Sequence, residues 1–463
     1  MEKPEDNSSF RDRMSTVGEK GNRIWVYAKK PRGKLYNYRN LLAYSLIAFL
    51  FLAPFIKVGG EQLILLNFIE RKFVLFGVVF WPQDFHLFVL SMITLIVFIV
   101  LFTVIYGRLF CGWVCPQTIF LEFIFRPIEW LIDGTPQQQK KLKLQKLNAN
   151  KVFKRVLKHG IYYLISFTIA LIFLSYILSS DTVFQIIDEG IGAHIGGFIG
   201  LLVFSFVFYF IFTWFREQVC IIACPYGRLQ GVMLDNNSMI VAYDYKRGEP
   251  RGPIKDKNNG DCINCHNCVS VCPTGIDIRN GTQLECVNCT ACIDACNAVM
   301  PRINKPKGLI RFASETSIAE GTKHKLNARA KAYSVVLGIL IVFVAYLFSV
   351  RADVETTILR APGTLYQDAG DSYSNLYTIE FVNKTRKEIP LDIKIMSESG
   401  KIQMIGENMN AKAEELTKSM FLVLIKKNEL FNSKNEIRFG VYSEDVLIDE
   451  IESTFVGPNS LDK

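Results

Sequence analysis

The last third of the chain contains no cysteine. All twelve cysteines of this 463-residue sequence lie between Cys111 and Cys296. They stand in tight groups, with two or three residues between neighbours, rather than being spread through a short secreted chain. This distribution excludes a disulfide scaffold and indicates metal or redox chemistry in a reducing compartment.

The N-terminal region lacks the features of a secretory signal. Residues 1–40 are polar and basic, with no apolar core and no small-residue cleavage site. The formal net charge of +9 is compatible with binding to nucleic acid, with binding to anionic lipid, or with cytoplasmic loops beside a membrane. Because the charge is dispersed next to apolar runs, we expect membrane lipid as a partner and no nucleic acid.

Five apolar segments are long enough to cross a bilayer, which takes ~20 helical residues. They are 41–57, 87–106, 160–178, 195–215 and 334–350. The alternative is a set of buried helices in a large soluble protein, which five such runs in one chain disfavour. We therefore predict a polytopic α-helical membrane protein with five transmembrane helices.

Lysine and arginine near the ends of these segments predict the orientation. They are dense in 1–40 and in 140–158, but the connection 179–194 has none and the connection 58–86 has two. The N-terminus is therefore predicted to be cytoplasmic, and all the cysteines fall on that side. The tail from 351 falls outside, in the oxidising compartment. Two inner stretches are apolar or basic enough to lie at the membrane surface: 118–130, which Pro127 interrupts, and 140–158.

The tail shows the pattern of antiparallel strands. Apolar residues alternate with polar ones in runs that Asn, Gly, Ser and Lys separate. About a hundred such residues predict a C-terminal immunoglobulin-like β-sandwich. Nothing in it looks catalytic, so a docking or scaffold role is expected.

The strongest motif is a C-x2-C-x2-C-x3-C-P run, the bacterial ferredoxin pattern that holds [4Fe–4S] clusters. It starts at Cys262 and ends at Pro273, and a second copy starts at Cys286 and has Asn297 in place of the proline. In this pattern the fourth cysteine of each run ligates the other cluster. Zinc is the alternative, but zinc does not need this spacing twice, and His266 is expected to be a polar loop residue. One cluster is assigned Cys262, Cys265, Cys268 and Cys296; the other is assigned Cys286, Cys289, Cys292 and Cys272.

A second pair of motifs has the form C-x3-C-P. One contains Cys111 and Cys115 and follows the second apolar segment; the other contains Cys220 and Cys224 and follows the fourth. If each is helical, its two cysteines face the same way. Paired thiolates select Cu(I), Zn or iron–sulfur iron, and a redox dithiol or two thiols buried as small hydrophobes are alternatives. The spacing does not choose between copper and a disulfide couple.

These motifs predict the domain order. We expect a basic cytoplasmic segment (1–40), then a first two-span unit (41–106) and a cytoplasmic connection with the first C-x3-C-P motif (107–159). A second two-span unit (160–215) follows, then a second cytoplasmic connection (216–333) that contains the second C-x3-C-P motif and an inserted bacterial-type 2[4Fe–4S] ferredoxin domain (about 255–305). The chain continues with a fifth span (334–350) and the outer immunoglobulin-like domain (351–463).

The sequence resembles the cytochrome c oxidase accessory proteins of the CcoG/FixG/RdxA type. The resemblance is carried by LFCGWVCPQ, VCIIACPYGRLQ, VAYDYKRGEPRG, DCINCHNCVSVCPTGIDIRNGTQLECVNC and the outer-loop motif FWPQDF at 80–85. It extends from the first apolar segment into the tail. It implies a five-span bacterial inner-membrane protein with two [4Fe–4S] clusters and a periplasmic immunoglobulin-like domain.

The resemblance also implies an activity. This would be a cupric reductase that converts Cu(II) to Cu(I) for assembly of a cbb(3)-type cytochrome c oxidase, with copper as substrate or transient ligand. The implied partners are a cytoplasmic electron donor and a copper transporter or oxidase assembly factors, and a homodimer is allowed. Two alternatives are a quinol-dehydrogenase-like electron-transfer subunit, which typically lacks the fifth span and outer β-domain, and a non-enzymatic redox-sensing assembly factor. By position, the residues implied for copper binding and catalysis are Cys111, Cys115, Cys220 and Cys224.

Overall fold

The computed structural model describes residues 15–458, apart from 19, 70–71, 81–84, 191, 255, 257, 323–327, 351–353, 362–364, 384–387, 397–399, 406–409, 412–415 and 431. Most of the outer-loop motif FWPQDF lies outside the described residues, as do Arg11, Arg13 and Arg71, which contribute to the predicted orientation. The chain forms two compact units. The first comprises Met1–Lys57, Gln62–Phe68 and Phe88–Val344; the second comprises Val58–Glu61, Ile69–Leu87 and Ala345–Lys463.

Six helical stretches among the described residues are long and apolar enough to cross a membrane. Five overlap the predicted segments: α1 (Lys34–Leu52), α2 (Phe85–Tyr106), α7 (Ala149–Leu178), α9 (Ile195–Phe210) with the π-helical η5 (Ile211–Phe215), and α15 (Ala328–Ser349).

The sixth stretch is Leu109–Ile132, of which the sequence assigns 118–130 to the membrane surface. In the structure it is 56% buried inside the protein, more than any of the other five. It consists of α3 (Leu109–Trp113), α4 (Pro116–Phe120), the π-helical η4 (Leu121–Phe125) and α5 (Arg126–Ile132). Its charged side chains form ion pairs within the protein, as described below. Because these charges are paired, the stretch can be buried.

Two helices begin earlier than the apolar runs suggest. α1 starts at Lys34 and α7 at Ala149, within stretches rich in lysine and arginine. Both residue types are good helix formers, so the helix continues beyond the apolar part. Arg39 of α1 is buried and donates from Nε to the carbonyl of Gly112 at 2.6 Å.

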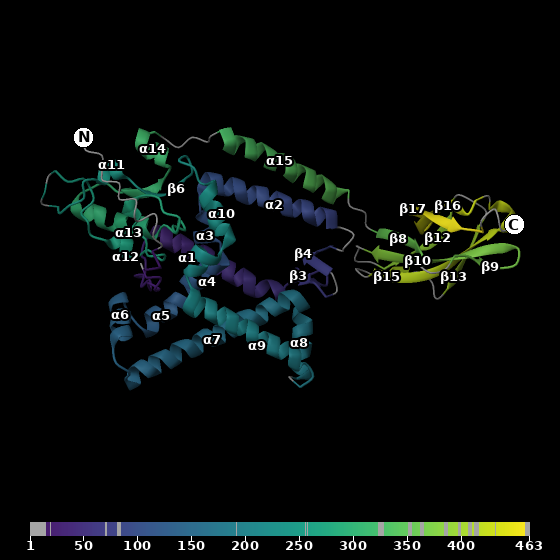
Figure 1. Cartoon of the computed structure of the whole chain (residues 1–463), viewed down its shortest axis with the longest axis horizontal. Helices are drawn as coiled ribbons and strands as arrows, with labels where there is room; N and C mark the ends of the chain where they lie inside the picture. Colours follow the sequence, from purple (N-terminus) through teal and green to yellow (C-terminus); the bar gives the residue numbers. More distant parts are fainter. Residues whose placement is uncertain are drawn as a thin grey trace. The chain divides into compact units, whose positions relative to one another are not determined.

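An aromatic core joins the helices around the sixth stretch. α7 packs along α9, and α8 (Ser180–Glu189) connects them (Figure 1). Phe125 of η4 stacks on Phe212 with ring centroids 4.5 Å apart, and Tyr162 of α7 contacts Phe125 edge-on at 4.9 Å. Offset and edge-on ring pairs of this kind add stability beyond the apolar area they bury.

The ferredoxin domain follows α9 in the same unit. Strands β6 (Ile240–Tyr243) and β7 (Ile310–Ala313) pair antiparallel and close it, over a core that includes Val241, Ile278 and Met300. Its other elements are η6 (Val219–Ala223), α10 (Pro225–Met233), α11 (Tyr245–Gly248), α12 (Asn267–Ser270), η7 (Ile278–Asn280), α13 (Ala291–Val299), η8 (Met300–Ile303) and α14 (Glu315–Glu320).

Short elements complete the chain before the tail. They are η2 (Ala53–Phe55), β1 (Lys57–Val58), β2 (Glu61–Gln62), β3 (Ile64–Asn67), β4 (Lys72–Leu75), β5 (Val78–Phe80) and α6 (Pro136–Leu144). Strands β4 and β5 form an antiparallel hairpin.

The tail is a two-sheet β-sandwich, as its alternating sequence predicts. One sheet has the order β13-β15-β10-β8, with β9 beside β10, and the other has the order β12-β16-β17. The rings of Tyr377, Phe421 and Phe439 meet between them and are fully buried. The bounds are β8 (Val354–Arg360), β9 (Gln367–Asp368), β10 (Ser372–Asn383), β11 (Ile389–Pro390), β12 (Asp392–Ile395), β13 (Gly400–Ile405), β14 (Asn410–Ala411), β15 (Leu416–Lys426), η9 (Lys427–Glu429), β16 (Lys434–Ser443) and β17 (Val446–Val456).

Candidate metal centres

Two cavities in the ferredoxin domain are lined by cysteines. The first cluster cavity is lined by Cys262, Cys265, Cys268 and Cys296. The second cluster cavity is lined by Cys272, Cys286, Cys289 and Cys292, and Cys268 also reaches it. The structure thus brings together the two sets of four that the ferredoxin pattern assigns, including the exchange of the fourth cysteine between the runs.

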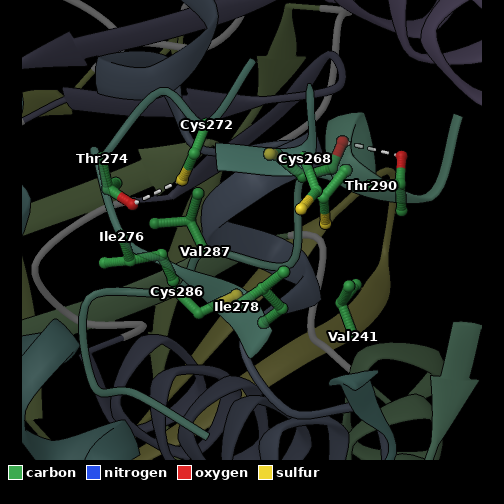
Figure 2. A pocket seen from close by; sticks show the side chains of 11 residues that line it. Val241, Cys268, Cys272, Thr274, Ile276, Ile278, Cys286, Val287 and Thr290 are labelled. Atoms are coloured by element: carbon green, nitrogen blue, oxygen red, sulfur yellow. Dashed lines mark hydrogen bonds between the residues drawn. The ribbon is translucent and has the colours of Figure 1, made fainter. Parts of the chain in front are cut away.

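The linings suit iron–sulfur clusters. In the second cluster cavity, the thiols alternate with apolar side chains such as Ile276, Ile278 and Val287 (Figure 2). Burial raises the pKa of Cys268 and of Cys286 to about 12, so a thiolate there needs a metal to stabilise its charge. Four cysteine sulfurs around an apolar cavity are the donor set that [4Fe–4S] clusters use, with one cysteine for each iron.

Both cysteine runs share an unusual backbone. The residues two and four positions after the first cysteine have positive φ angles: Asn264 and His266 in the first run, Asn288 and Thr290 in the second. Left-handed residues other than glycine are disfavoured and persist where the surrounding structure requires them. Alternation of such residues directs backbone N–H groups into a concave nest, which favours an anion such as a thiolate-bound cluster.

Side chains around the runs fix their loops. Arg279 donates to Asp277, to Asn264 and to the Nδ1 side of His266 at 3.0 Å. His266 is exposed, which agrees with its expected role as a polar loop residue. Asn297, which replaces the proline, accepts from the N–H of Gly308 at 2.9 Å and so holds the chain after α13.

The two C-x3-C-P motifs are not continuous helices. Cys111 lies in α3, but Cys115 is the N-cap of α4, which begins at Pro116. Cys220 lies in η6, Cys224 is extended, and Pro225 begins α10. A residue before proline avoids the helical region, and proline is well suited to the first turn of a helix. The condition of one continuous helix for each pair is therefore not met, whereas a new helix does begin at each proline.

The four thiols of these motifs form one neighbourhood. Cys220 interacts electrostatically with Cys115, Cys111 and Cys224, and burial raises its pKa to about 12. Within the part of the chain that the structure describes, no three His, Cys, Asp or Glu side chains are gathered tightly enough to hold a single metal ion. Binding one ion by these thiols would therefore require them to move together.

The first of these motifs packs against the second cluster cavity. Cys111 shares a buried cluster with Val287 and Cys289. A side chain at Gly112 would lie 2.3 Å from the carbonyl oxygen of Val287, so only glycine permits this approach. Trp113 donates from its indole nitrogen to the carbonyl of Asn288 at 3.2 Å. The thiol neighbourhood and the cluster cavity are thus in direct contact.

A glutamine that sequence reasoning misses lies at this site. The Oε1 atom of Gln230, in α10, accepts from the thiol of Cys111 at 2.9 Å and from Nε of Arg108 at 3.3 Å. Its amide nitrogen donates to the hydroxyl of Thr103 at 3.3 Å. Gln230 is fully buried, and it lies 119 residues from Cys111 in the chain, so no local pattern marks it.

Family models match three parts of the chain. A 4Fe-4S dicluster domain matches residues 215–315, a 4Fe-4S binding domain matches 88–133, and a domain described as the IG-like fold at the C-terminal of FixG matches 344–458. The match at 88–133 contains Cys111 and Cys115, the first pair of the thiol neighbourhood.

Relatives cover most of the chain. The protein RdxB of Cereibacter sphaeroides is 31% identical over 397 residues, which are 81% of this chain and 82% of RdxB. The chain belongs to the FixG/RdxA family. RdxA of the same organism is 34% identical over 54% of this chain and 53% of its own, and the nitrogen fixation protein FixG of Rhizobium meliloti is 32% identical over 64% and 58%.

This FixG/RdxA-type chain is therefore a ferredoxin-containing membrane protein with 4Fe–4S-binding domains, and its role is electron transfer. The crystal structure of a FixG-related protein from Vibrio parahaemolyticus is 22% identical and aligns with 23% of this chain and 97% of that one, with a TM-score of 0.20.

The FixG/RdxA-type chain also has a buried ionic network under its ferredoxin domain. Arg126 pairs with Glu122 and Glu217 and donates to the carbonyl of Pro273, next to Cys272, at 3.0 Å. The second half of the network contains Arg216 with Glu129 at 2.8 Å, Lys158 with Glu129 at 3.8 Å, and Lys158 with Asp133. The network ties α5, α7 and the residues before Cys220 to the loop that contains Cys272.

Proposed function

We propose that the protein is a cupric reductase in which Cu(II) is reduced to Cu(I) at the thiol neighbourhood of Cys111, Cys115, Cys220 and Cys224. The observation that carries the proposal is the contact between this neighbourhood and the second cluster cavity. Cys111 and Cys289 belong to one buried cluster, so an electron acceptor bound by the thiols is adjacent to the cluster ligands.

The ferredoxin cysteines hold the redox groups. The set of Cys262, Cys265, Cys268 and Cys296 would bind one [4Fe–4S] cluster, and the set of Cys272, Cys286, Cys289 and Cys292 would bind the other. When bound, such clusters accept and release single electrons. The apolar linings keep water from the thiolates, and the positive-φ loops direct N–H groups at the negative charge.

The thiol neighbourhood suits copper as a substrate. Sulfur is a soft ligand that favours Cu(I), so a site with four thiols stabilises the product of the reduction. Each Cu(II) takes up one electron and becomes Cu(I). Thiols must lose their protons to bind a metal, and the high pKa of Cys220 means that the incoming metal displaces its proton into solvent.

The product would serve assembly of a cbb(3)-type cytochrome c oxidase. Under this proposal, the chain lies in a bacterial inner membrane with a cytoplasmic N-terminus and a periplasmic tail. The cysteine-free β-domain then docks a copper transporter or an oxidase assembly factor. Its fully buried core and lack of thiols support a binding role rather than a redox role.

The test is Cu(I) formation by the purified, dithionite-reduced protein, followed with a Cu(I)-specific chelator after excess dithionite is removed. We expect Cys111→Ser/Cys115→Ser to abolish the protein-dependent rate while the iron content stays at about eight atoms per chain, two clusters of four. Cys286→Ser should abolish the rate with a loss of iron. A rate unchanged in both variants would disprove the proposal, and about twelve irons per chain would assign the four thiols to a third cluster.

A further inference from the structure

A groove of about 460 Å³ lies beside both cluster cavities. Its lining includes Cys265, which also lines the first cluster cavity, and Cys272, which also lines the second. Of the twelve cysteines, all within the described residues, Cys265 alone is exposed. A donor molecule that occupies this groove therefore contacts a ligand of each cluster from the solvent side.

The walls of the groove are fixed rather than loosely placed. One wall is the extended segment that runs through Trp25 and Tyr27, the second is the start of α6, and the third is the loop of the first ferredoxin run. The N–H of Lys29 donates to the carbonyl of Ser270 at 2.8 Å, which ties the first wall to the third. Gly275 has a φ of +76°, and a Cβ there would lie 2.9 Å from Val26, so the two walls are in close contact.

The groove and its neighbour carry only positive charge. A second hollow of about 550 Å³ shares Lys29, Pro136 and Asn267 with the groove. No aspartate or glutamate is among the described residues that line either space. The cations along the two spaces are Lys29, Lys30, Arg32, Lys140 and Arg302. A phosphate-bearing ligand would find charge-assisted hydrogen bonds along this path.

Aromatic side chains line the same path. Trp25 and Tyr27 line the groove, and Trp130 lines the second hollow, where its indole nitrogen donates to the carbonyl of Ala28 at 3.1 Å. Aromatic faces beside cations bind flat ring systems that carry phosphate. The volume of each space lies within the range of small-molecule sites. A lipid headgroup needs the cations but not the rings.

We propose that the groove is an electron-entry site that binds a reduced flavin nucleotide, with the ring system beside Cys265 and the phosphate toward Lys29 and Lys140. The inference rests on the proposed function, because it supplies the electrons that reduce copper. A flavin hydroquinone gives up two electrons in two single steps, is oxidised to the quinone and releases its protons to solvent. One electron would pass to each of the two [4Fe–4S] clusters that the cysteines of the two cavities would hold, and such clusters accept single electrons. A nicotinamide transfers its electrons as a hydride pair, which does not match one-electron acceptors.

The test is a titration of full-length, detergent-solubilised protein with flavin mononucleotide, followed by quenching of flavin fluorescence. We expect saturable binding, and Lys29→Gln/Lys140→Gln should raise the Kd by about tenfold, because two partly solvent-screened charges are removed. The matched control is Lys141→Gln/Lys146→Gln, which removes the same charge from exposed residues that line neither space. The control should change the Kd by less than about twofold. Riboflavin, which has no phosphate, should bind the wild type about as weakly as flavin mononucleotide binds the groove variant.

Three results would overturn the inference. The first is an absence of saturable quenching, and the second is an equal loss of affinity in both lysine double variants. The third is displacement of flavin mononucleotide by phosphatidylglycerol vesicles that depends on Lys29 and Lys140, which would assign the groove to lipid headgroups. The binding measurement needs no copper, and the copper assay uses dithionite as donor. Copper reduction without flavin binding therefore disproves only this inference, whereas flavin binding without copper reduction disproves only the proposed function.

Discussion

Gln230 connects the two C-x3-C-P motifs through one buried amide. It follows Cys224 in the chain, yet it accepts the hydrogen bond from the thiol of Cys111 and also bonds Arg108 and Thr103. Because Gln230 is fully buried, water cannot replace these bonds if its side chain is removed. The residue therefore holds the first motif in place relative to the second.

We predict that Gln230→Ala lowers the rate of Cu(I) formation and the free energy of unfolding, while the iron content is unchanged. Leaving buried donors without an acceptor costs about 1–3 kcal/mol. Thermal unfolding, the chelator assay and iron analysis measure the three quantities. Gln185→Ala, on α8, is the control, because its side chain bonds only the exposed Glu189 among the contacts described. Equal melting temperatures and equal rates for the two variants would show that Gln230 has no positioning role.

Residue patterns predict which cysteines line each cavity but not what surrounds them. The eight ferredoxin cysteines lie in two short runs, so their spacing alone predicts which four share a cavity. Gln230, Arg108 and Asn288 come together only through the fold, from positions more than a hundred residues apart in the case of Gln230 and Cys111. The positive φ angles at Asn264 and Thr290 are equally hidden, because neither residue is glycine.

At the scale of elements, the stretch Leu109–Ile132 is where sequence and structure differ most. Its sequence mixes apolar residues with Glu122, Arg126 and Glu129, which favours a surface position. In the structure these charges pair inside the protein, so the stretch is buried. Hydropathy is an average over a segment and contains no information about which residue each charge pairs with. The burial of this stretch therefore could not be predicted from the sequence, whereas the membrane-spanning character of the five more apolar segments could.

Arg126 is the residue that joins this stretch to the ferredoxin loop. We predict that Arg126→Met lowers the free energy of unfolding by about 3–5 kcal/mol, because it leaves Glu122 buried without the arginine that pairs with it. Glu217 loses one of its three arginines and keeps Arg23 and Arg216. It also removes the hydrogen bond to the carbonyl of Pro273. Thermal unfolding in detergent measures the change.

Two further variants serve as a control and a rescue for that measurement. Lys418→Met removes the exposed ion pair with Glu380, and we expect it to cost less than about 1 kcal/mol. Arg126→Met/Glu122→Leu removes both members of one buried pair, while Glu217 keeps its pairs with Arg23 and Arg216. This variant should recover most of the lost stability, since apolar replacements of a buried ion pair are often neutral. An Arg126→Met protein as stable as Lys418→Met would show that the buried network does not contribute to stability.

At the scale of the whole molecule, thiol chemistry and the β-domain are separate. The first unit contains every cysteine, and the tail contains none and has its own core of Tyr377, Phe421 and Phe439. A domain that folds without thiols is suited to an oxidising compartment, whereas free cysteines and clusters need a reducing one. The distribution of lysine and arginine independently predicts the same two sides.

This orientation makes a labelling prediction. Because the tail has no cysteine, Lys434→Cys places a single thiol there, on an exposed position at the start of β16. We expect a membrane-impermeant maleimide to label this variant in intact spheroplasts. Lys141→Cys, on exposed α6, should be labelled only after lysis, and the wild type should stay unlabelled before it, because its twelve thiols are predicted to face the cytoplasm. Labelling of Lys141→Cys in intact spheroplasts, or protection of Lys434→Cys there, would contradict the predicted orientation. The thiol neighbourhood would then lie on the oxidising side, where Cu(I) production by the proposed route would not be sustained.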